Sequence, residues 1–338
     1  MPGVARSLRE KWSRTRAVLE PRRSSIEALV ARAFPGAGIV AVERTFGGLA
    51  NTNFRLELSD SRLEPSGKTV LLRYWQRDQQ QAAKEIALLS FVGRRVPVPA
   101  VLATGDADPD FGLPFAFMQW IDGERLDALA PRLAPAALKD VGREVGGALA
   151  AIHGFAFERQ GFFGADLVPR DDLDMDMRGI VAWLDHCLRE GPGGERLGAA
   201  LTEALFAFVA REGHVLSSAW SSQPTLTHSD FNGSNVLLRE EPEGGWRIAA
   251  ILDWEFAFAG GPSFDFGNLL RPPLGDEAAF MSGVTGGYRA AGKQLPEGWL
   301  EASRLADLLS WVDFVSQPVC GAAVIKSARY MISRVIGG

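Results

Sequence analysis

The stretch LTHSDFNGSNVLL, residues 226–238, decides the fold of this chain. It places His228, Asp230 and Asn235 between a short polar run and the apolar residues VLL. A turn accepts Asn and Asp readily, because their side chains bond to nearby backbone groups. A carboxylate and an amide five residues apart can also act together, one on a proton and the other on a metal ion. The rest of the chain has to decide between these two interpretations.

The spacing His-x-Asp-x-x-x-x-Asn equals that of the catalytic loop of kinases, in which the Asp accepts the proton of the attacking hydroxyl and the Asn binds a metal ion. Mg²⁺ prefers oxygen ligands and usually needs a second acid. Asp253, in ILDWE, follows 18 residues after Asn235. Residues 235–238 and 246–254 alternate like strands around the turn REEPEGG, so we expect a hairpin that brings Asn235 and Asp253 to the same end. Because this second acid is present, the interpretation of residues 228–235 as a simple polar turn is much weaker than the interpretation as a catalytic loop.

The first 120 residues predict a small antiparallel sheet with helices. Residues 5–34 have helical spacing, interrupted near Pro21, with Ser24 or Ser25 as a cap. Strands are expected in residues 39–46, in residues 53–58 after the turn GGLANTN, in TVLLRYW (69–75), and in the two runs VPVPAVLATG and PFAFMQWI. QQQAAKEIALLSFVG, residues 79–93, has helical spacing.

From about residue 134 the chain is mostly helical, apart from the hairpin. The expected fold class is therefore α+β. We divide the chain into an N-terminal helical extension (1–34), a part with most of the strands (35–120) and a mostly helical part (121–338).

Composition and charge argue against some classes of function. The chain has 338 residues and a net charge of −5, with +5 in residues 1–120 and −10 in residues 121–338. The larger part has no basic stripe for nucleic acid, and no apolar run approaches the ~20 residues of a membrane span. Cys187 and Cys320 form no CxxC, which favours a reducing compartment and a cytoplasmic location. Basic residues near the start indicate a solvated amphipathic helix, with a transit peptide as the alternative.

These motifs together resemble the aminoglycoside phosphotransferase-like small-molecule kinases, a family related to choline and homoserine kinases, over residues 35–320. Residues 226–238 resemble the family's catalytic segment. AAILDWEFAFAGGPSFDFGNLL (249–270) resembles its metal-binding segment with a downstream Asp, here Asp265. FMQWIDGERL (117–126) resembles the linker between lobes. The resemblance implies a two-lobed protein-kinase-like fold. Residues 35–120 would form a small antiparallel, nucleotide-binding N-lobe, and residues 121–338 a larger, mostly helical C-lobe for catalysis and acceptor binding.

The resemblance also implies a role for each matching residue. Asp230 would be the catalytic base, and Asn235 and Asp253 would hold Mg²⁺. The cofactor would be ATP or GTP. The hairpin turn with Gly47, Gly48 and Asn51 would cover the phosphates of the nucleotide. Gln119 and Ile121 would contact the base through backbone groups. His228 and Asp265 would be structural residues of the site.

Protein kinases carry a Lys on the third strand, paired with a Glu of the next helix, and this chain departs from that pattern. TVLLRYW offers Arg73, and the following helix offers Glu85. Arg binds phosphate with bidentate geometry, so we expect Arg73 to take the place of the Lys. Lys68 and Lys84 are the alternatives.

The acceptor is the open part of the prediction. The acidic C-lobe predicts a hydroxylated, amine-bearing small molecule, such as an aminoglycoside-like antibiotic, because a negative field concentrates cations. The acids of RDDLDMDMRG (170–179) could belong to an acceptor patch or to a solvated helix start. A metabolic kinase of a sugar, amino alcohol or amino acid is one alternative, and a nucleotide-binding pseudokinase is another. No partner other than the small-molecule acceptor is expected, and the oligomeric state is open.

Overall fold

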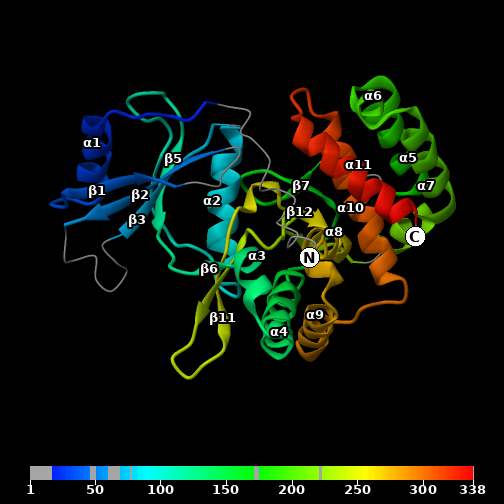
Figure 1. Ribbon diagram of the computed structural model, residues 1–338. Helices are drawn as coiled ribbons and strands as arrows, with labels where there is room; N and C mark the ends of the chain where they lie inside the picture. The colour runs from blue at the N-terminus through cyan, green and yellow to red at the C-terminus, as the bar shows by residue number, and fades with distance from the viewer. Residues whose placement is uncertain are drawn as a thin grey trace.

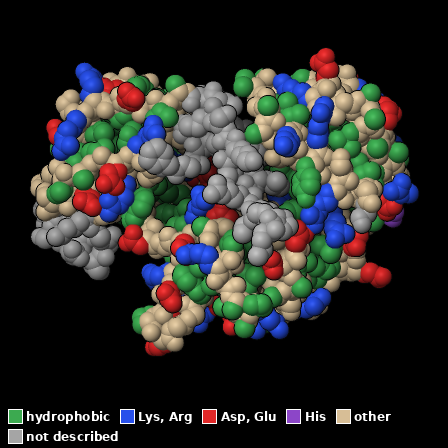
Figure 2. All heavy atoms as spheres, viewed as in Figure 1, with side chains coloured by type: hydrophobic (Ala, Val, Ile, Leu, Met, Phe, Trp, Pro, Cys, Tyr) green, Lys and Arg blue, Asp and Glu red, His purple; other side chains and the backbone are tan. Residues whose placement is uncertain are grey.

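The computed structural model describes residues 17–45, 51–59, 69–76, 78–170, 175–220 and 223–337. They form a small N-terminal lobe and a larger C-terminal lobe, joined through residues 119–124 (Figure 1). In Figure 2 the surface is indented between the two lobes.

The N-lobe is built on an antiparallel five-stranded sheet with the strand order β1-β2-β3-β5-β4. In β2 buried and half-buried residues alternate, because successive side chains of a strand point to opposite faces. The strands are β1 Ile39–Arg44, β2 Thr52–Leu58, β3 Thr69–Tyr74, β4 Val101–Gly105 and β5 Phe115–Gln119.

Two helices flank this sheet (Figure 1). Helix α1, Arg23–Ala33, buries Ile26 in one apolar cluster with Leu56 of β2. Helix α2, Gln80–Val92, buries Leu88 in a different cluster, which also contains apolar residues of the C-lobe. Helix α2 therefore joins the N-lobe to the core of the C-lobe, whereas α1 packs only within the N-lobe.

The start of α1 differs from the sequence-based expectation. Residues 17–22 form no helix, and the cap residue Arg22 makes no side-chain cap bond. Ser25 donates its hydroxyl to Asp110 Oδ1 at 2.8 Å, and the Arg22 backbone N–H donates to Oδ2 of the same carboxylate at 2.7 Å. The predicted serine cap is wrong because a carboxylate from a distant loop takes the hydroxyl. The basic residues before position 17 lie outside the described residues.

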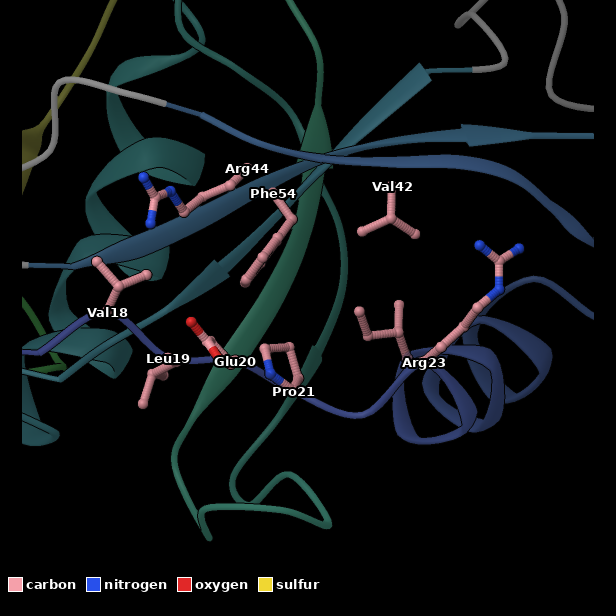
Figure 3. A pocket seen from close by; sticks show the side chains of 9 residues that line it. Val18, Leu19, Glu20, Pro21, Arg23, Val42, Arg44 and Phe54 are labelled. Carbon is pink, nitrogen blue, oxygen red and sulfur yellow. The ribbon is translucent and has the colours of Figure 1, made fainter.

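A pocket of about 530 Å³ lies between this N-terminal segment and the sheet. Figure 3 shows Val18 and Leu19 of the segment on one side of it and Phe54 of β2 on the other. Its lining residues are Val18, Leu19, Glu20, Pro21, Arg23, Ile26, Val42, Arg44 and Phe54. None of these residues belongs to the motifs that predict the catalytic site.

The C-lobe is mostly helical, as predicted, and contains two apolar clusters. The first is shared with α2, and the second lies among α5, α7, α10 and α11. The helices are α3 Leu126–Leu129, α4 Pro135–Ile152, α5 Met177–Asp185, α6 Gly193–Leu197, α7 Ala199–Trp220, α8 Pro262–Leu269, α9 Ala278–Ala290, α10 Trp299–Ser316 and α11 Ala322–Ile336. Short 3₁₀ turns cover residues 130–132, 254–256 and 274–276, and a π turn covers residues 186–190.

Helices α4 and α9 cross at very short range, and glycine permits it. A Cβ on Gly146 of α4 would lie 2.0 Å from the Val284 carbonyl oxygen, and one on Gly287 of α9 would lie 2.0 Å from the Arg143 carbonyl oxygen. Neither position has room for a side chain, so these glycines fix the distance between the two helices.

Two small sheets complete the C-lobe. The first has the order β11-β10-β6, and the second, hereafter the central sheet, has the order β8-β7-β12-β9. The strands are β6 Glu124–Arg125, β7 Gly161–Phe163, β8 Pro169–Arg170, β9 Thr225–Thr227, β10 Val236–Glu240, β11 Trp246–Ile251 and β12 Phe258–Gly260. The predicted hairpin is confirmed as β10 and β11, which pair Val236 with Ile251. The central sheet was not predicted.

The described residues carry charged side chains of both signs and two cysteines. On the face shown in Figure 2, basic and acidic side chains are interspersed without a continuous basic stripe. Cys187 and Cys320 are free thiols. Within the described residues, no helix combines the length and apolar character needed to cross a membrane.

Candidate active site

The predicted catalytic loop connects β9 to β10 and holds Asp230 in a buried position. Asp230 is 4% exposed. Its Oδ1 accepts a hydrogen bond from Asn232 Nδ2 at 2.9 Å, and its Oδ2 accepts one from Asn235 Nδ2 at 3.0 Å. The two amides therefore fix the orientation of the Asp230 carboxyl group.

His228 fixes the backbone of this loop. Its Nδ1 accepts the Asp230 backbone N–H at 3.2 Å, so Nε2, 3.0 Å from the Leu252 carbonyl oxygen, carries the hydrogen and donates it. This assignment makes the imidazole neutral, and the ring is fully buried. It ties the catalytic loop to the end of β11.

Asp265, in the first turn of α8, is the second anchor of the loop. Its Oδ2 accepts the His228 backbone N–H at 3.0 Å, and its Oδ1 accepts the Ser229 backbone N–H at 2.7 Å. His153 Nε2 lies 3.1 Å from Oδ2. Ser229 has a φ of 66°, in the left-handed region, so the loop turns sharply at the place where Asp265 holds it. The sequence singled out Asp265 but not His153.

The hairpin brings the two expected metal ligands together. The Leu252 backbone N–H donates to the Asn235 carbonyl oxygen at 2.8 Å, and Asp253 follows directly with a left-handed backbone, φ 67°. In the described part of the chain, nothing donates a hydrogen bond to Oδ1 of Asn235 or to Oδ2 of Asp253. One oxygen of each side chain is therefore available as a ligand.

Arg73 reaches this pair from the other lobe. From β3, its Nη2 lies 2.8 Å from Asp253 Oδ1 and 3.1 Å from Glu85 Oε2 of α2. Trp75 Nε1 donates to the same Glu85 oxygen at 2.7 Å. The predicted Arg73–Glu85 contact is thus present, and the same guanidinium group also bridges to the C-lobe.

A second contact between the lobes was not predicted. Asn51 Nδ2 donates to Glu255 Oε2 at 3.2 Å, and Lys84 Nζ donates to the Glu255 carbonyl oxygen at 2.5 Å. Glu255 and Lys84 are both buried. Lys84, one of the alternatives to Arg73, therefore binds the backbone of the turn that follows Asp253.

Comparison with known proteins identifies the family. The model of the phosphotransferase enzyme family, APH, matches residues 42–304. The chain belongs to this family. The match includes both the catalytic loop and the hairpin that carries Asp253.

Solved structures of this family share the fold of this phosphotransferase. Aminoglycoside phosphotransferase APH(4)-Ia is 18% identical with a TM-score of 0.66, over 94% of this chain and 99% of that one. A thermostable mutant of APH(4)-Ia in a ternary complex with AMP-PNP and hygromycin B is 19% identical with a TM-score of 0.63, over 93% and 98%. The two-lobed, protein-kinase-like α+β fold is thereby confirmed.

A curated relative matches part of the phosphotransferase. The 4-hydroxytryptamine kinase of Psilocybe cubensis is 27% identical over 147 residues. The match spans 41% of this chain and 37% of the length of that kinase.

The electrostatics of the cluster keep its arginine charged. Burial alone would lower the pKa of Arg73, but Glu85, Asp253 and Glu255 outweigh burial and raise it. Burial raises the pKa of Glu85, which Arg73 and the Trp75 N–H oppose. Arg73 therefore stays protonated between Glu85 and Asp253.

The other predicted residues are only partly placed. Gly47 and Gly48 lie outside the described residues, as does Lys68. Gln119 ends β5, where its backbone N–H donates to the Ala100 carbonyl oxygen at 2.8 Å. Ile121 lies two residues further along the connection between the lobes.

Proposed function

We propose that this phosphotransferase is a small-molecule kinase that transfers the γ-phosphoryl group of ATP, or GTP, to a hydroxyl group. The observation that carries the proposal is the cluster at the junction of the lobes. Two amide side chains donate hydrogen bonds to Asp230. The hairpin places Asp253 next to Asn235, and Arg73 of the N-lobe donates a hydrogen bond to Asp253.

Asp230 is the general base of the proposed reaction. The acceptor oxygen attacks the γ-phosphorus, the bond from that phosphorus to the bridging oxygen breaks, and ADP or GDP leaves. The proton of the hydroxyl passes to the Asp230 carboxylate. General base assistance of this kind contributes about 10²–10⁴-fold to a rate. His228 and Asp265 act through Asp230, because they fix the loop that carries it.

Asn235 and Asp253 are the proposed Mg²⁺ ligands. The available oxygens, an amide Oδ1 and a carboxylate Oδ2, are the hard ligands that Mg²⁺ prefers. Within the described residues no three His, Cys, Asp or Glu side chains form a metal site by themselves, so phosphate oxygens and water would complete the shell. When bound, the ion neutralises charge on the phosphoryl group.

The N-lobe binds the nucleotide in this proposal. Arg73 contacts phosphate oxygens, with Glu85 holding its guanidinium group from behind. Gly47, Gly48 and Asn51 contact the phosphates in this proposal. The segment from Gln119 to Ile121 meets the base through backbone groups. The AMP-PNP complex of a structural neighbour supports nucleotide binding.

The acceptor is a hydroxylated, amine-bearing small molecule in the leading version of the proposal. The net charge of −10 in residues 121–338 supports it, as do hygromycin B and 4-hydroxytryptamine in the names of similar proteins. Within the acidic run, the Asp176 side chain accepts the Gly179 N–H and caps α5, as expected of a helix start. Residues 171–174 lie outside the described residues. A metabolic kinase of a sugar, amino alcohol or amino acid is the second candidate.

A nucleotide-binding pseudokinase is the third candidate. The deciding experiment offers ATP or GTP, with Mg²⁺, together with aminoglycosides, amino alcohols, amino acids and sugars, and looks for phosphorylated acceptor by mass spectrometry. Phosphorylation of an amine-bearing alcohol supports the leading version, and phosphorylation of a neutral sugar supports the second candidate. Tight Mg-nucleotide binding without transfer to any acceptor would favour the pseudokinase.

A further inference from the structure

Helix α2 buries two charged side chains that follow each other in the sequence. Lys84 is 6% exposed and Glu85 is 1% exposed, although lysine and glutamate are almost never fully buried unless they are paired. Glu85 is paired with Arg73 and with the Trp75 N–H. Lys84 Nζ donates instead to a backbone group of the other lobe, the Glu255 carbonyl oxygen, at 2.5 Å. Figure 1 shows α2 on the side of the N-lobe sheet that faces the C-lobe.

The carbonyl group that Lys84 binds belongs to the turn of residues 253–257. We name it the metal turn, because it begins with the proposed Mg²⁺ ligand Asp253. Asp253 has a φ of 67°, a left-handed conformation that a residue other than glycine keeps only where its surroundings hold it. Residues 254–256 continue as a 3₁₀ turn. The direction of the Asp253 carboxylate therefore depends on the contacts that hold the metal turn.

The metal turn is held from both lobes. On the C-lobe side, Trp254 is fully buried in the apolar core. On the N-lobe side, Asn51 donates to the side chain of Glu255, and Lys84 donates to the backbone of the same residue. A contact to a side chain can move with the torsions of that side chain, whereas a bond to a carbonyl oxygen fixes the backbone itself. The bond from Lys84 thus fixes the backbone two residues after Asp253.

The carboxylates around Lys84 favour its ammonium form. Burial lowers the pKa of Lys84, and Glu85, Glu255 and Asp78 oppose this change. A hydrogen bond from an ammonium group is charge-assisted and is stronger than a bond between two neutral groups. The contact between Lys84 and the metal turn is therefore a strong, buried bond from one lobe to the other.

We propose that Lys84 is a positioning residue of the metal site, which holds the backbone of the metal turn against α2 and so directs the Asp253 carboxylate toward the ion. This inference rests on the proposed kinase function and adds a residue to its metal site. Lys84 contacts neither the nucleotide nor the ion in this proposal and acts through Asp253. Since Glu85, the next residue, holds Arg73, α2 would position the phosphate-binding arginine and the metal-binding aspartate together.

The test measures how much Mg²⁺ strengthens nucleotide binding. Calorimetry gives the Kd of AMP-PNP in EDTA and in excess Mg²⁺, and the ratio of the two values is the metal coupling. Lys84→Met keeps the aliphatic chain and removes the donor. We expect its metal coupling to fall at least about 10-fold, as for other residues that orient metal ligands, while its Kd in EDTA stays within about twofold of the wild-type value. Lys84→Arg keeps a cationic donor and should retain most of the coupling.

Two further variants complete the design, and circular dichroism checks that each is folded. Lys293→Met is the matched control, because Lys293 Nζ also donates to a backbone carbonyl oxygen, that of His153, at 2.9 Å. Its metal coupling should equal that of the wild type. Lys84→Gln, whose amide nitrogen is one bond closer to the backbone, is the milder variant if Lys84→Met does not fold. Its metal coupling should also fall.

The outcomes separate this inference from the proposed function. A folded Lys84→Met, or Lys84→Gln, with the metal coupling of the wild type overturns the inference, because Lys84 would then be only structural. An equal loss of affinity in EDTA and in Mg²⁺ overturns it as well, since Lys84 would then contact the phosphates directly. Equal losses of coupling in Lys84→Arg and Lys84→Met would show that the donor does not matter, and would also overturn it. All three results leave the kinase function standing. A wild-type protein that binds no AMP-PNP, or binds it equally with and without Mg²⁺, would overturn the proposed function on which the inference rests.

Discussion

Replacing Arg73 with Ala should weaken the fold and the nucleotide site together. Arg73 is 7% exposed, and its partner Glu85 is 1% exposed. Breaking a buried ion pair by removing one partner costs about 3–5 kcal/mol, because the other charge stays buried. Trp75 still donates to Glu85, so we expect about 3 kcal/mol. Asp253 is one-third exposed, and loss of its contact adds less than ~1 kcal/mol.

The loss should depend on pH, with a sign that follows from Glu85. Burial raises the pKa of this carboxyl, and Arg73 opposes the rise. Without Arg73 the folded state holds the proton more tightly than the unfolded state does. Stability is then retained at low pH and lost as pH rises through the folded-state pKa. Urea unfolding should therefore show a larger difference between Arg73→Ala and the wild type at pH 8 than at pH 5.

A double variant separates packing from phosphate binding. Arg73→Met with Glu85→Gln removes both charges and keeps an acceptor for Trp75, so we expect it to lose only about 1 kcal/mol. Its KM for ATP should remain as high as that of Arg73→Ala. Arg55→Ala, which breaks pairs on the surface of β2, is the matched control and should lose less than ~1 kcal/mol. An Arg73→Ala deficit below ~1 kcal/mol, or one that is equal at both pH values, would refute this reasoning.

Two further variants test the other parts of the site. Asp253→Ala should weaken Mg-nucleotide binding in calorimetry and abolish transfer, and unchanged affinity and metal dependence would remove Asp253 from the site. Asp265→Ala leaves the backbone N–H groups of His228 and Ser229 and the ring of His153 without their acceptor, so we expect a loss of about 3 kcal/mol in urea unfolding. Its kcat should fall while nucleotide affinity stays close to the wild-type value, and an unchanged kcat would show that Asp265 does not position the loop.

The sequence predicted the parts of the site that depend on short connections. Asn235 and Asp253 meet because one tight turn joins β10 to β11, and hairpins of this kind are visible as two alternating runs around a turn. Arg73 and Glu85 are twelve residues apart, on a strand and the helix that follows it. In both cases the alternation of side chains fixes which face each residue occupies.

The contacts and strands that the sequence analysis did not predict join residues far apart in the chain. Asn51 and Glu255 are separated by 204 positions, and His153 and Asp265 by 112. The central sheet consists of strands of two or three residues, too short for a periodic pattern, since mean strands have about 5–6 residues. The sequence therefore predicted no strand at β7. The serine cap of α1 failed for the same reason, because Asp110 is 85 positions from Ser25.

The most direct measurement follows the γ-phosphoryl group itself. Wild type and Asp230→Asn are incubated with Mg²⁺, γ-³²P-labelled ATP and an accepted amino alcohol, and label in the acceptor is counted. The account predicts a labelled phosphate ester with the wild type and a rate at least ~10²-fold lower with Asp230→Asn, while both proteins bind Mg-ATP with similar affinity. Label transfer at an undiminished rate by Asp230→Asn would contradict the assignment of Asp230 as the base on which the account rests.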